Sequence, residues 1–239
     1  MQSDGGALRS IRRKGYRYLA DMPNSEHPAE TSTPPTIHGT VAPGFEAVRD
    51  AFAGNFATQG DVGASVAITI GGDLVVDLWG GTATFDGPDD DEAGVPGVAG
   101  DWQEDTIINV WSTTKTMAAL CCLMLADRGE LDLYEPIATY WPEFAANGKE
   151  TVATRHVLSH TAGLSGWDEP LTRFDLLDHD KLVTLHAAQA PWWEPGTKSG
   201  YHAISQGYLL GEIVKRVDGR SLGTFFAEEV AGPLGADFH

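Results

Sequence analysis

The feature that most constrains the fold of this chain is a pair of neighbouring segments with the composition of β-strands. Residues 64–70 and 74–79 are rich in β-branched and other apolar residues, and a short turn beginning with Gly71 and Gly72 separates them. This arrangement predicts an antiparallel hairpin. Because an isolated hairpin is only marginally stable, these strands require further strands or a helix packed across them. No segment after the hairpin is as typical of a strand.

Most of the remaining chain has the apolar spacing of helices. Phe45, Val48, Phe52 and Phe56 describe one face of a helix, and the folded domain is expected to begin there. Further helices are predicted after Ser112 and over residues 154–160, 181–189 and 204–217. A strand region followed by a long helical region predicts an α+β fold.

We divide the chain at residue 42. Residues 1–42 combine a basic start with a stretch rich in Pro, Ser, Thr and Glu, which predicts a flexible leader. A basic targeting or docking arm is the less favoured interpretation. Residues 43–239 are expected to form one domain, since a chain of 239 residues with 42% hydrophobic content has enough apolar side chains for a packed core.

The charge of the chain limits its partners. It carries 16 basic and 34 acidic residues, a net charge of −18. This excess of negative charge disfavours nucleic acid and anionic membrane surfaces as partners. The acidic run 89–92 is flanked by Gly and Pro, which is more typical of a solvated loop than of a metal site.

The two cysteines and the hydropathy of the chain bear on its core and its location. Cys121 and Cys122 are adjacent within an apolar helix, so a disulfide between them is implausible and both are expected to be buried thiols. No segment approaches the roughly 20 apolar residues that cross a bilayer, and the start of the chain lacks the apolar run of a secretory signal. We therefore predict a cytoplasmic location.

A candidate nucleophile stands where a polar segment gives way to an apolar helix. Ser112 and Lys115 are three residues apart, so they share a helix face and the lysine amine can accept the serine proton. The apolar residues Ile107, Ile108 and Trp111 predict a buried approach to this helix. On the tetrapeptide alone, a helix-capping serine and a solvated lysine are the simpler interpretation.

Three segments in order raise this motif above chance. The first is Trp111–Lys115 with the helix behind it and the exit at 127–133, the second is 156–164 (HVLSHTAGL), and the third runs from 194 through the tyrosine turn to 235. Together they resemble the serine hydrolases of the class C β-lactamase and penicillin-binding-protein superfamily, and its carboxylesterases most closely. The resemblance covers about residues 43–239.

The resemblance implies a β-lactamase/transpeptidase-like fold, in which a helical region packs on an antiparallel sheet. In that family the other strands come from the C-terminal end, so only the N-terminal hairpin of the sheet is expected in this chain. We therefore expect a C-terminally incomplete domain that belongs to a longer enzyme. Unpaired strand edges also predict marginal stability or self-association through the incomplete sheet.

Carried over residue by residue, the resemblance implies that Ser112 is the nucleophile, Lys115 its proton acceptor and Tyr201 a second general base or acid. Unperturbed lysine and tyrosine side chains have pKa values of about 10.4 and about 10, so neither is a good base at neutral pH without help from its surroundings. Burial favours a neutral Lys115, whereas a charged Lys115 favours a tyrosinate at Tyr201. The sequence leaves both arrangements open.

Two departures from the family pattern bear on activity. The backbone N–H of Ser112 is expected to supply one oxyanion donor, whereas the family takes the second from a strand beyond the tyrosine block, and this chain stops at His239. Residues 198–200 are not the equivalent of that strand, because they lie in the turn directly before the tyrosine. Ala203 stands where the β-lactamases and peptidases place an Asn, which favours ester substrates.

Other candidate site residues are weaker. His156 and His160 are four residues apart, but the general-base Glu of a zinc protease motif is missing and no third ligand is evident, so neither a metal nor another cofactor is expected. Trp192 and Trp193 are candidate substrate-binding residues for an acyl pocket, with core packing as the alternative for at least one.

The sequence thus predicts a serine carboxylesterase that hydrolyses small carboxylic esters through an acyl-enzyme on Ser112. A β-lactamase, a D-amino-acid peptidase or an acyltransferase of the same superfamily is the alternative within this chemistry. The alternative from another class is a catalytically impaired binding or interaction fragment, because loss of one oxyanion donor costs about 100- to 1,000-fold in turnover.

Overall fold

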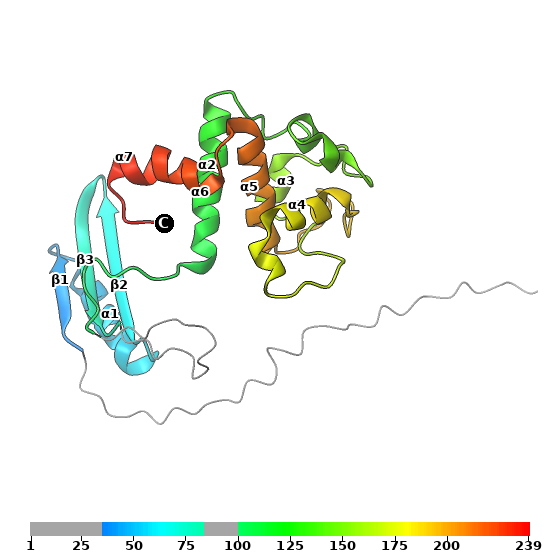
Figure 1. Ribbon diagram of the computed structural model, residues 1–239. Coiled ribbons are helices and arrows are strands. Elements are labelled where there is room, and N and C mark those ends of the chain that lie inside the picture. Colours follow the sequence, from blue (N-terminus) through cyan, green and yellow to red (C-terminus); the bar gives the residue numbers. More distant parts are fainter. Residues whose placement is uncertain (1–34, 84–99) are drawn as a thin grey trace, which may run out of the picture. The chain divides into compact units, whose positions relative to one another are not determined.

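The computed structural model describes residues 35–83 and 100–239, which fall into two compact units with a boundary between Thr106 and Ile107 (Figure 1). Most of the expected leader, residues 1–34, and the acidic run 89–92 lie outside the described residues. The first unit contains β1 (Ile37–Val41), α1 (Glu46–Thr58), β2 (Gly63–Ile70) and β3 (Asp73–Gly81).

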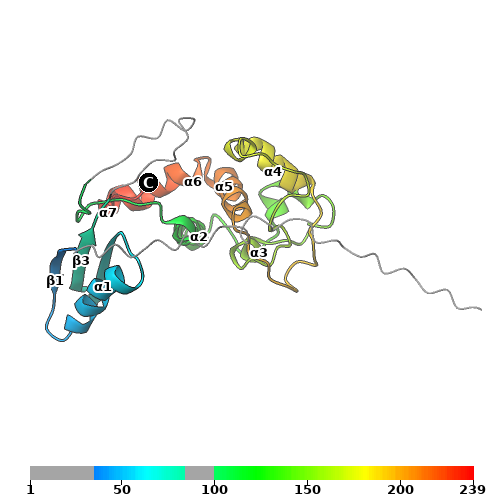
Figure 2. The same ribbon diagram turned by 90° about the horizontal axis from the view of Figure 1, so that it is seen from below.

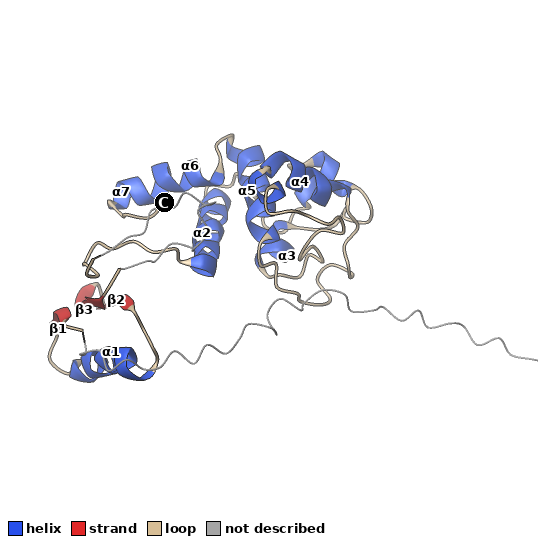
Figure 3. Cartoon of the chain, turned by 60° about the horizontal axis from the view of Figure 1, so that its bottom comes forward, coloured by secondary structure: helices blue, strands red, loops and turns tan. Residues whose placement is uncertain are grey.

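β3 is the central strand of an antiparallel sheet with the order β1-β3-β2. β2 and β3 form the predicted hairpin, and Gly71 and Gly72 both have positive φ, 61° and 95°, as a two-residue turn of this kind requires. α1 lies across one face of the sheet (Figure 3). Phe52 of α1 packs there against Val76 and Leu78 of β3, which gives the first unit its own small core.

The strand β1 corrects two expectations, a leader that extends to residue 42 and a sheet represented by the hairpin alone. Ile37–Val41 pairs with β3 from Ile37 opposite Gly80 to Val41 opposite Val76. The strand is short and has a glycine at its centre, so its own sequence favours the strand conformation only weakly. Pairing with β3 stabilises it, and tertiary context of this kind overrides local propensity.

The second unit is built from helices around a central one (Figures 1 and 2). Its helices are α2 (Thr114–Asp127), α3 (Thr154–Leu158), α4 (His179–Ala188), α5 (Ser205–Asp218), α6 (Leu222–Phe226) and α7 (Gly232–Leu234). α5 packs against α2, α3, α4 and α6, and its side chains Leu209, Leu210, Ile213 and Val214 are buried. The four helices expected in this region are therefore confirmed, with small shifts at their ends.

The structure confirms the predicted burial of the two cysteines in α2 and corrects the predicted burial of the segment before it. Cys121 and Cys122 are buried free thiols, and burial raises their pKa values to about 11 and about 12. The approach to α2 is not buried, because Ile107, Ile108 and Trp111 are 63%, 63% and 80% exposed. Apolar composition did not predict this exposure, because residues 107–110 form no strand or helix that would turn one face toward a core.

In the described parts of the chain, no helix combines the length and the apolarity needed to span a bilayer.

Candidate active site

Ser112 lies in a short 3-10 turn, Trp111–Thr113, that leads directly into α2. The residue before it, Trp111, has a left-handed backbone with φ of 47°, and its N–H donates to Asn109 Oδ1 at 2.9 Å. A positive φ is strained for a bulky residue, and such strain is concentrated at functional sites. The candidate nucleophile is therefore held in a constrained turn ahead of the helix.

Three side chains converge at this turn. Ser112 Oγ and Tyr201 Oη share a hydrogen bond of 2.5 Å, and Lys115 Nζ donates to the same serine oxygen at 3.4 Å. Lys115 Nζ also donates to the backbone oxygen of Ala203 at 2.8 Å and lies 5.0 Å from the centre of the tyrosine ring. The structure thus brings together the serine, lysine and tyrosine that the sequence selected.

The surroundings of Tyr201 lower its pKa below the usual value of 10.0. The largest cause is the hydrogen bond with Ser112, followed by the hydrogen bond with Lys115 and by the lysine charge, while partial burial acts in the opposite direction. Each of the lowering effects stabilises the phenolate form. Of the two proton arrangements that the sequence left open, this favours a tyrosinate beside the lysine.

The turn that carries Tyr201 is attached to the segment 156–164. The N–H of Gly200 donates to the backbone oxygen of His160 at 3.0 Å, and the N–H of His202 donates to His160 Nδ1 at 3.2 Å. The His160 ring also contacts the Tyr201 ring edge-on, with centroids 4.9 Å apart. The sequence marked His160 only as part of a motif and as a rejected metal ligand, so its contacts with the tyrosine turn were not foreseen.

The two tryptophans have different surroundings. The indole N–H of Trp193 donates to the backbone oxygen of Lys198 at 2.9 Å, and its ring covers Gly200, where a Cβ would lie 2.4 Å from it. Trp192 is 48% exposed and its indole N–H donates to Asp168 Oδ1 at 2.6 Å. Trp193 therefore braces the tyrosine turn. A substrate-binding role for either tryptophan stays a prediction.

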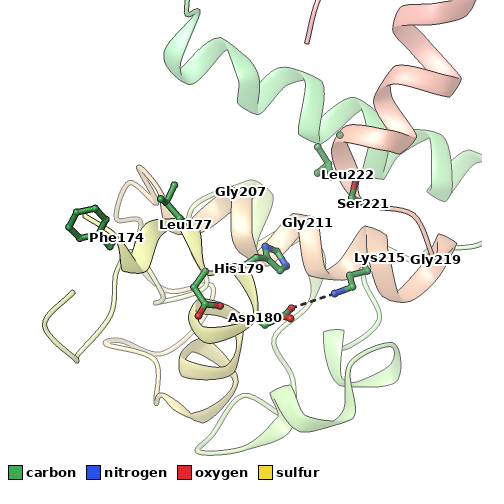
Figure 4. A pocket seen from close by; sticks show the side chains of 12 residues that line it. Phe174, Leu177, His179, Asp180, Gly207, Gly211, Lys215, Gly219, Ser221 and Leu222 are labelled. Atoms are coloured by element: carbon green, nitrogen blue, oxygen red, sulfur yellow. Dashed lines mark ion pairs between the residues drawn. The ribbon is translucent and has the colours of Figure 1, made fainter. Parts of the chain in front are cut away.

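A separate cavity of about 810 Å³ runs along α5 (Figure 4). Gly207 and Gly211 of α5 line it, together with His179 and Asp180 from the start of α4. Two of its charged side chains pair with each other, Lys215 Nζ with Asp180 at 3.5 Å. None of the three converging side chains lines this cavity, so we assign the chemistry to the serine site.

Known proteins are similar to this chain over most of its length. The Beta-lactamase family model matches residues 48–237. Esterase/beta-lactamase LipL of Mycobacterium tuberculosis is 40% identical over 202 residues, which cover 84% of this chain and 44% of LipL. Esterase EstB of Burkholderia gladioli is 36% identical over 163 residues, 61% of this chain and 40% of EstB.

Two solved structures are also similar to this chain over most of its length. A family VIII carboxylesterase shares 48% identity with a TM-score of 0.74 over 84% of this chain and 52% of its own. A penicillin-binding protein homologue from Caulobacter crescentus shares 42% identity, also with a TM-score of 0.74, over 84% of this chain and 51% of its own. The chain therefore spans about half the length of these proteins, and it has their β-lactamase/transpeptidase-like fold over that half. Because the family model matches most of its length, the chain belongs to the beta-lactamase family.

Proposed function

We propose that this chain carries the nucleophile of a serine hydrolase that cleaves small carboxylic esters through an acyl-enzyme on Ser112. The observation that carries the proposal is the 2.5 Å contact between Ser112 Oγ and Tyr201 Oη, with Lys115 Nζ 3.4 Å from the same serine oxygen. Relatives named esterase and carboxylesterase support the ester class. Ala203, in place of the Asn of the peptidases, supports esters over amides.

In acylation, Tyr201 as the phenolate accepts the proton of Ser112 while Oγ attacks the ester carbonyl carbon. The tetrahedral intermediate then expels the alkoxide, which takes the proton from the Tyr201 hydroxyl and leaves as the alcohol. The positive charge of Lys115 beside both oxygens favours the phenolate that begins the cycle. A positioned general base of this kind contributes about 100- to 10,000-fold to the rate.

In deacylation, a water molecule gives its proton to Tyr201 as it attacks the acyl carbon. The second tetrahedral intermediate expels Ser112 Oγ, which takes the proton back from Tyr201, and the carboxylic acid is released. An alcohol in the place of water would give a new ester, so the same intermediate also serves an acyltransferase. The site chemistry is shared, and the acceptor decides the product.

We assign the backbone N–H of Ser112 as one oxyanion donor. It stands at the N-terminal end of α2, where the helix dipole favours negative charge. Removal of one such donor costs about 100- to 1,000-fold in turnover, so this N–H is expected to contribute substantially to the rate.

The test is release of p-nitrophenol from p-nitrophenyl acetate and butyrate, combined with mass spectrometry of the acylated peptide. The wild-type chain is expected to carry the acyl group on Ser112, and Ser112→Ala is expected to carry none. Ser65→Ala, which alters an exposed serine of β2, is the matched control and is expected to acylate normally. Undiminished acylation in Ser112→Ala would refute the assignment, and a wild-type chain that never acylates would support a binding fragment instead.

A further inference from the structure

His160 holds the turn around Tyr201 from both sides. Its backbone oxygen accepts the N–H of Gly200, and its Nδ1 accepts the N–H of His202, so the residues directly before and after the tyrosine are tied to one histidine. Its ring meets the tyrosine ring edge-on, with an interplanar angle of 66°. Since 54% of Tyr201 is exposed, the contacts of its covered part determine where the hydroxyl points.

We propose that His160 is a positioning residue, which holds the Tyr201 hydroxyl against Ser112 Oγ through one ring contact and two hydrogen bonds to the flanking backbone. The inference rests on the proposed function of the site. His160 is 42 positions from His202 in the chain and contacts the tyrosine, not the reacting atoms. Its effect on the reaction therefore passes through Tyr201.

The backbone of His160 is built for this contact. Its φ is 61°, a left-handed conformation that is uncommon outside glycine and that Asn, Asp and His adopt more often than other residues. It follows the end of α3 (Thr154–Leu158) and turns the side chain back toward the tyrosine turn. A residue held in a costly conformation that places its side chain on a functional group is typical of a position with a specific task.

The ring must be neutral for the Nδ1 contact, because a protonated Nδ1 cannot accept the His202 N–H. Burial lowers the pKa of His160, and the charge of Lys115 lowers it further. The other titratable rings against it are Tyr201 and His202, with His202 centred 5.5 Å away. The proton state that the geometry needs is thus the one that the surroundings favour.

Three substitutions of His160 distinguish its ring contact with Tyr201 from its Nδ1 hydrogen bond with the N–H of His202. His160→Asn keeps an acceptor near the position of Nδ1 and tolerates the left-handed backbone but loses the ring, whereas His160→Phe keeps a ring and loses the acceptor. His160→Ala loses both. We expect kcat for p-nitrophenyl acetate to fall on the order of 100-fold in His160→Ala and less in the other two, with a smaller change in KM, because misplacement by about 1 Å has this cost.

The matched control is His179→Asn. His179 also has one polar partner, Glu212, and one aromatic neighbour, Tyr208, but it lies outside the serine site. We expect this variant to keep the wild-type kcat. Melting temperatures of all variants, measured by circular dichroism, exclude a loss of folding as the cause.

A double-mutant cycle distinguishes positioning from a general structural effect. In the Tyr201→Phe background, the His160 substitutions are expected to cause no further loss of kcat, because the hydroxyl that they misplace is already gone. Losses that simply add to that of Tyr201→Phe would overturn the proposal.

A readout without turnover separates the proposal from the proposed function. With tyrosines labelled by ¹³C at Cζ and the Tyr201 signal identified by its loss in Tyr201→Phe, an NMR titration gives the pKa of this hydroxyl directly. We expect the pKa to rise toward its usual value in His160→Ala and to stay unchanged in His179→Asn. An unchanged Tyr201 titration in all three His160 variants would overturn the proposal, whereas a shifted titration in a chain that never acylates would uphold it and refute only the ester hydrolase.

Discussion

Tyr201 Oη lies 2.5 Å from Ser112 Oγ, although 89 positions separate the two residues in the chain. Ser112 stands in the turn before α2 and Tyr201 in the turn before α5, and these two helices pack against each other. The site thus lies where the N-terminal ends of both helices meet. Helix N-termini favour negative charge, which agrees with the phenolate and the oxyanion that we propose for this site.

Replacement of Lys115 by methionine is expected to move the rising limb of the pH profile of kcat/KM to higher pH. Methionine keeps an unbranched apolar stem but removes the hydrogen bond and the charge that lower the pKa of Tyr201. Since acylation needs the phenolate, activity is lost as the pH falls below that pKa, and a higher pKa moves the loss upward. Hydrolysis of p-nitrophenyl acetate between about pH 6 and about pH 10 measures the limb.

The control for this prediction is Lys115→Arg, which keeps the positive charge. Its limb is expected to lie between those of the wild type and Lys115→Met. Coincident profiles for the wild type and Lys115→Met would contradict a role of the lysine in setting the proton state of the tyrosine.

Gly39→Ala is expected to destabilise the first unit far more than Gly60→Ala. Both glycines have positive φ, 90° and 76°, but a Cβ at Gly39 would lie 1.9 Å from the backbone oxygen of Asp77, whereas one at Gly60 meets nothing within 4 Å. Gly60→Ala therefore carries only the conformational cost of about 1–2 kcal/mol, while Gly39→Ala must also push β1 away from β3. Urea unfolding followed by circular dichroism compares the two, and equal losses would contradict a tight β1–β3 contact.

Gly39 also shows where sequence reasoning reached its limit. The hairpin was predictable because its signal is local, a glycine pair between two strand-like segments. β1 was not, because Ile37–Val41 becomes a strand only through pairing with β3. The need for glycine at its centre appears only once the backbone oxygen of Asp77 lies close to Gly39. Local patterns identify elements, whereas partners far along the chain decide the weak ones.

The residues of the candidate site also differ in whether the sequence predicts them. Ser112 and Lys115 were predictable from their spacing, and Tyr201 from the family resemblance. The proposed role of His160 depends on contacts with residues about 40 positions later in the chain and on a left-handed backbone, and neither leaves a periodic pattern. The exposure of Trp111 escaped prediction for a related reason, because its strained backbone sets the direction of the side chain against its apolar character.

Acid is expected to destabilise the second unit through His186. This side chain is buried against the Trp167 ring, 4.4 Å between centroids, and both of its ring nitrogens are without a partner among the described residues. Burial, followed by the charges of His202 and Lys149, lowers its pKa to about 3. The unfolded chain takes up this proton below about pH 6.5 while the folded chain does not, so stability falls as the pH drops from about 6.5 toward 3.

His186→Phe removes this titration while keeping a ring against Trp167. At pH 5 the proton uptake of His186 in the unfolded chain corresponds to about 2 kcal/mol. The melting temperature of the wild type is therefore expected to decrease more than that of His186→Phe between pH 7.5 and pH 5. Parallel losses in the two proteins would show that His186 is not the acid-sensitive group.

We propose that self-association of the chain, expected through the incomplete sheet, uses β2, an edge strand of the described sheet, and a charge on this strand tests the proposal. Ala67 is exposed on β2 and lies opposite Asp77 of β3, so a lysine at this position has a cross-strand partner and leaves the hairpin intact. Lysines on edge strands oppose pairing with another chain. Ala67→Lys is therefore expected to shift the chain toward the monomer in sedimentation velocity experiments. Thr40→Lys is the matched control, because Thr40 is exposed on β1 and also lies opposite Asp77. If only Thr40→Lys dissociates the oligomer, the chains associate through β1 instead. If neither substitution dissociates it, the sheet edges are not the interface.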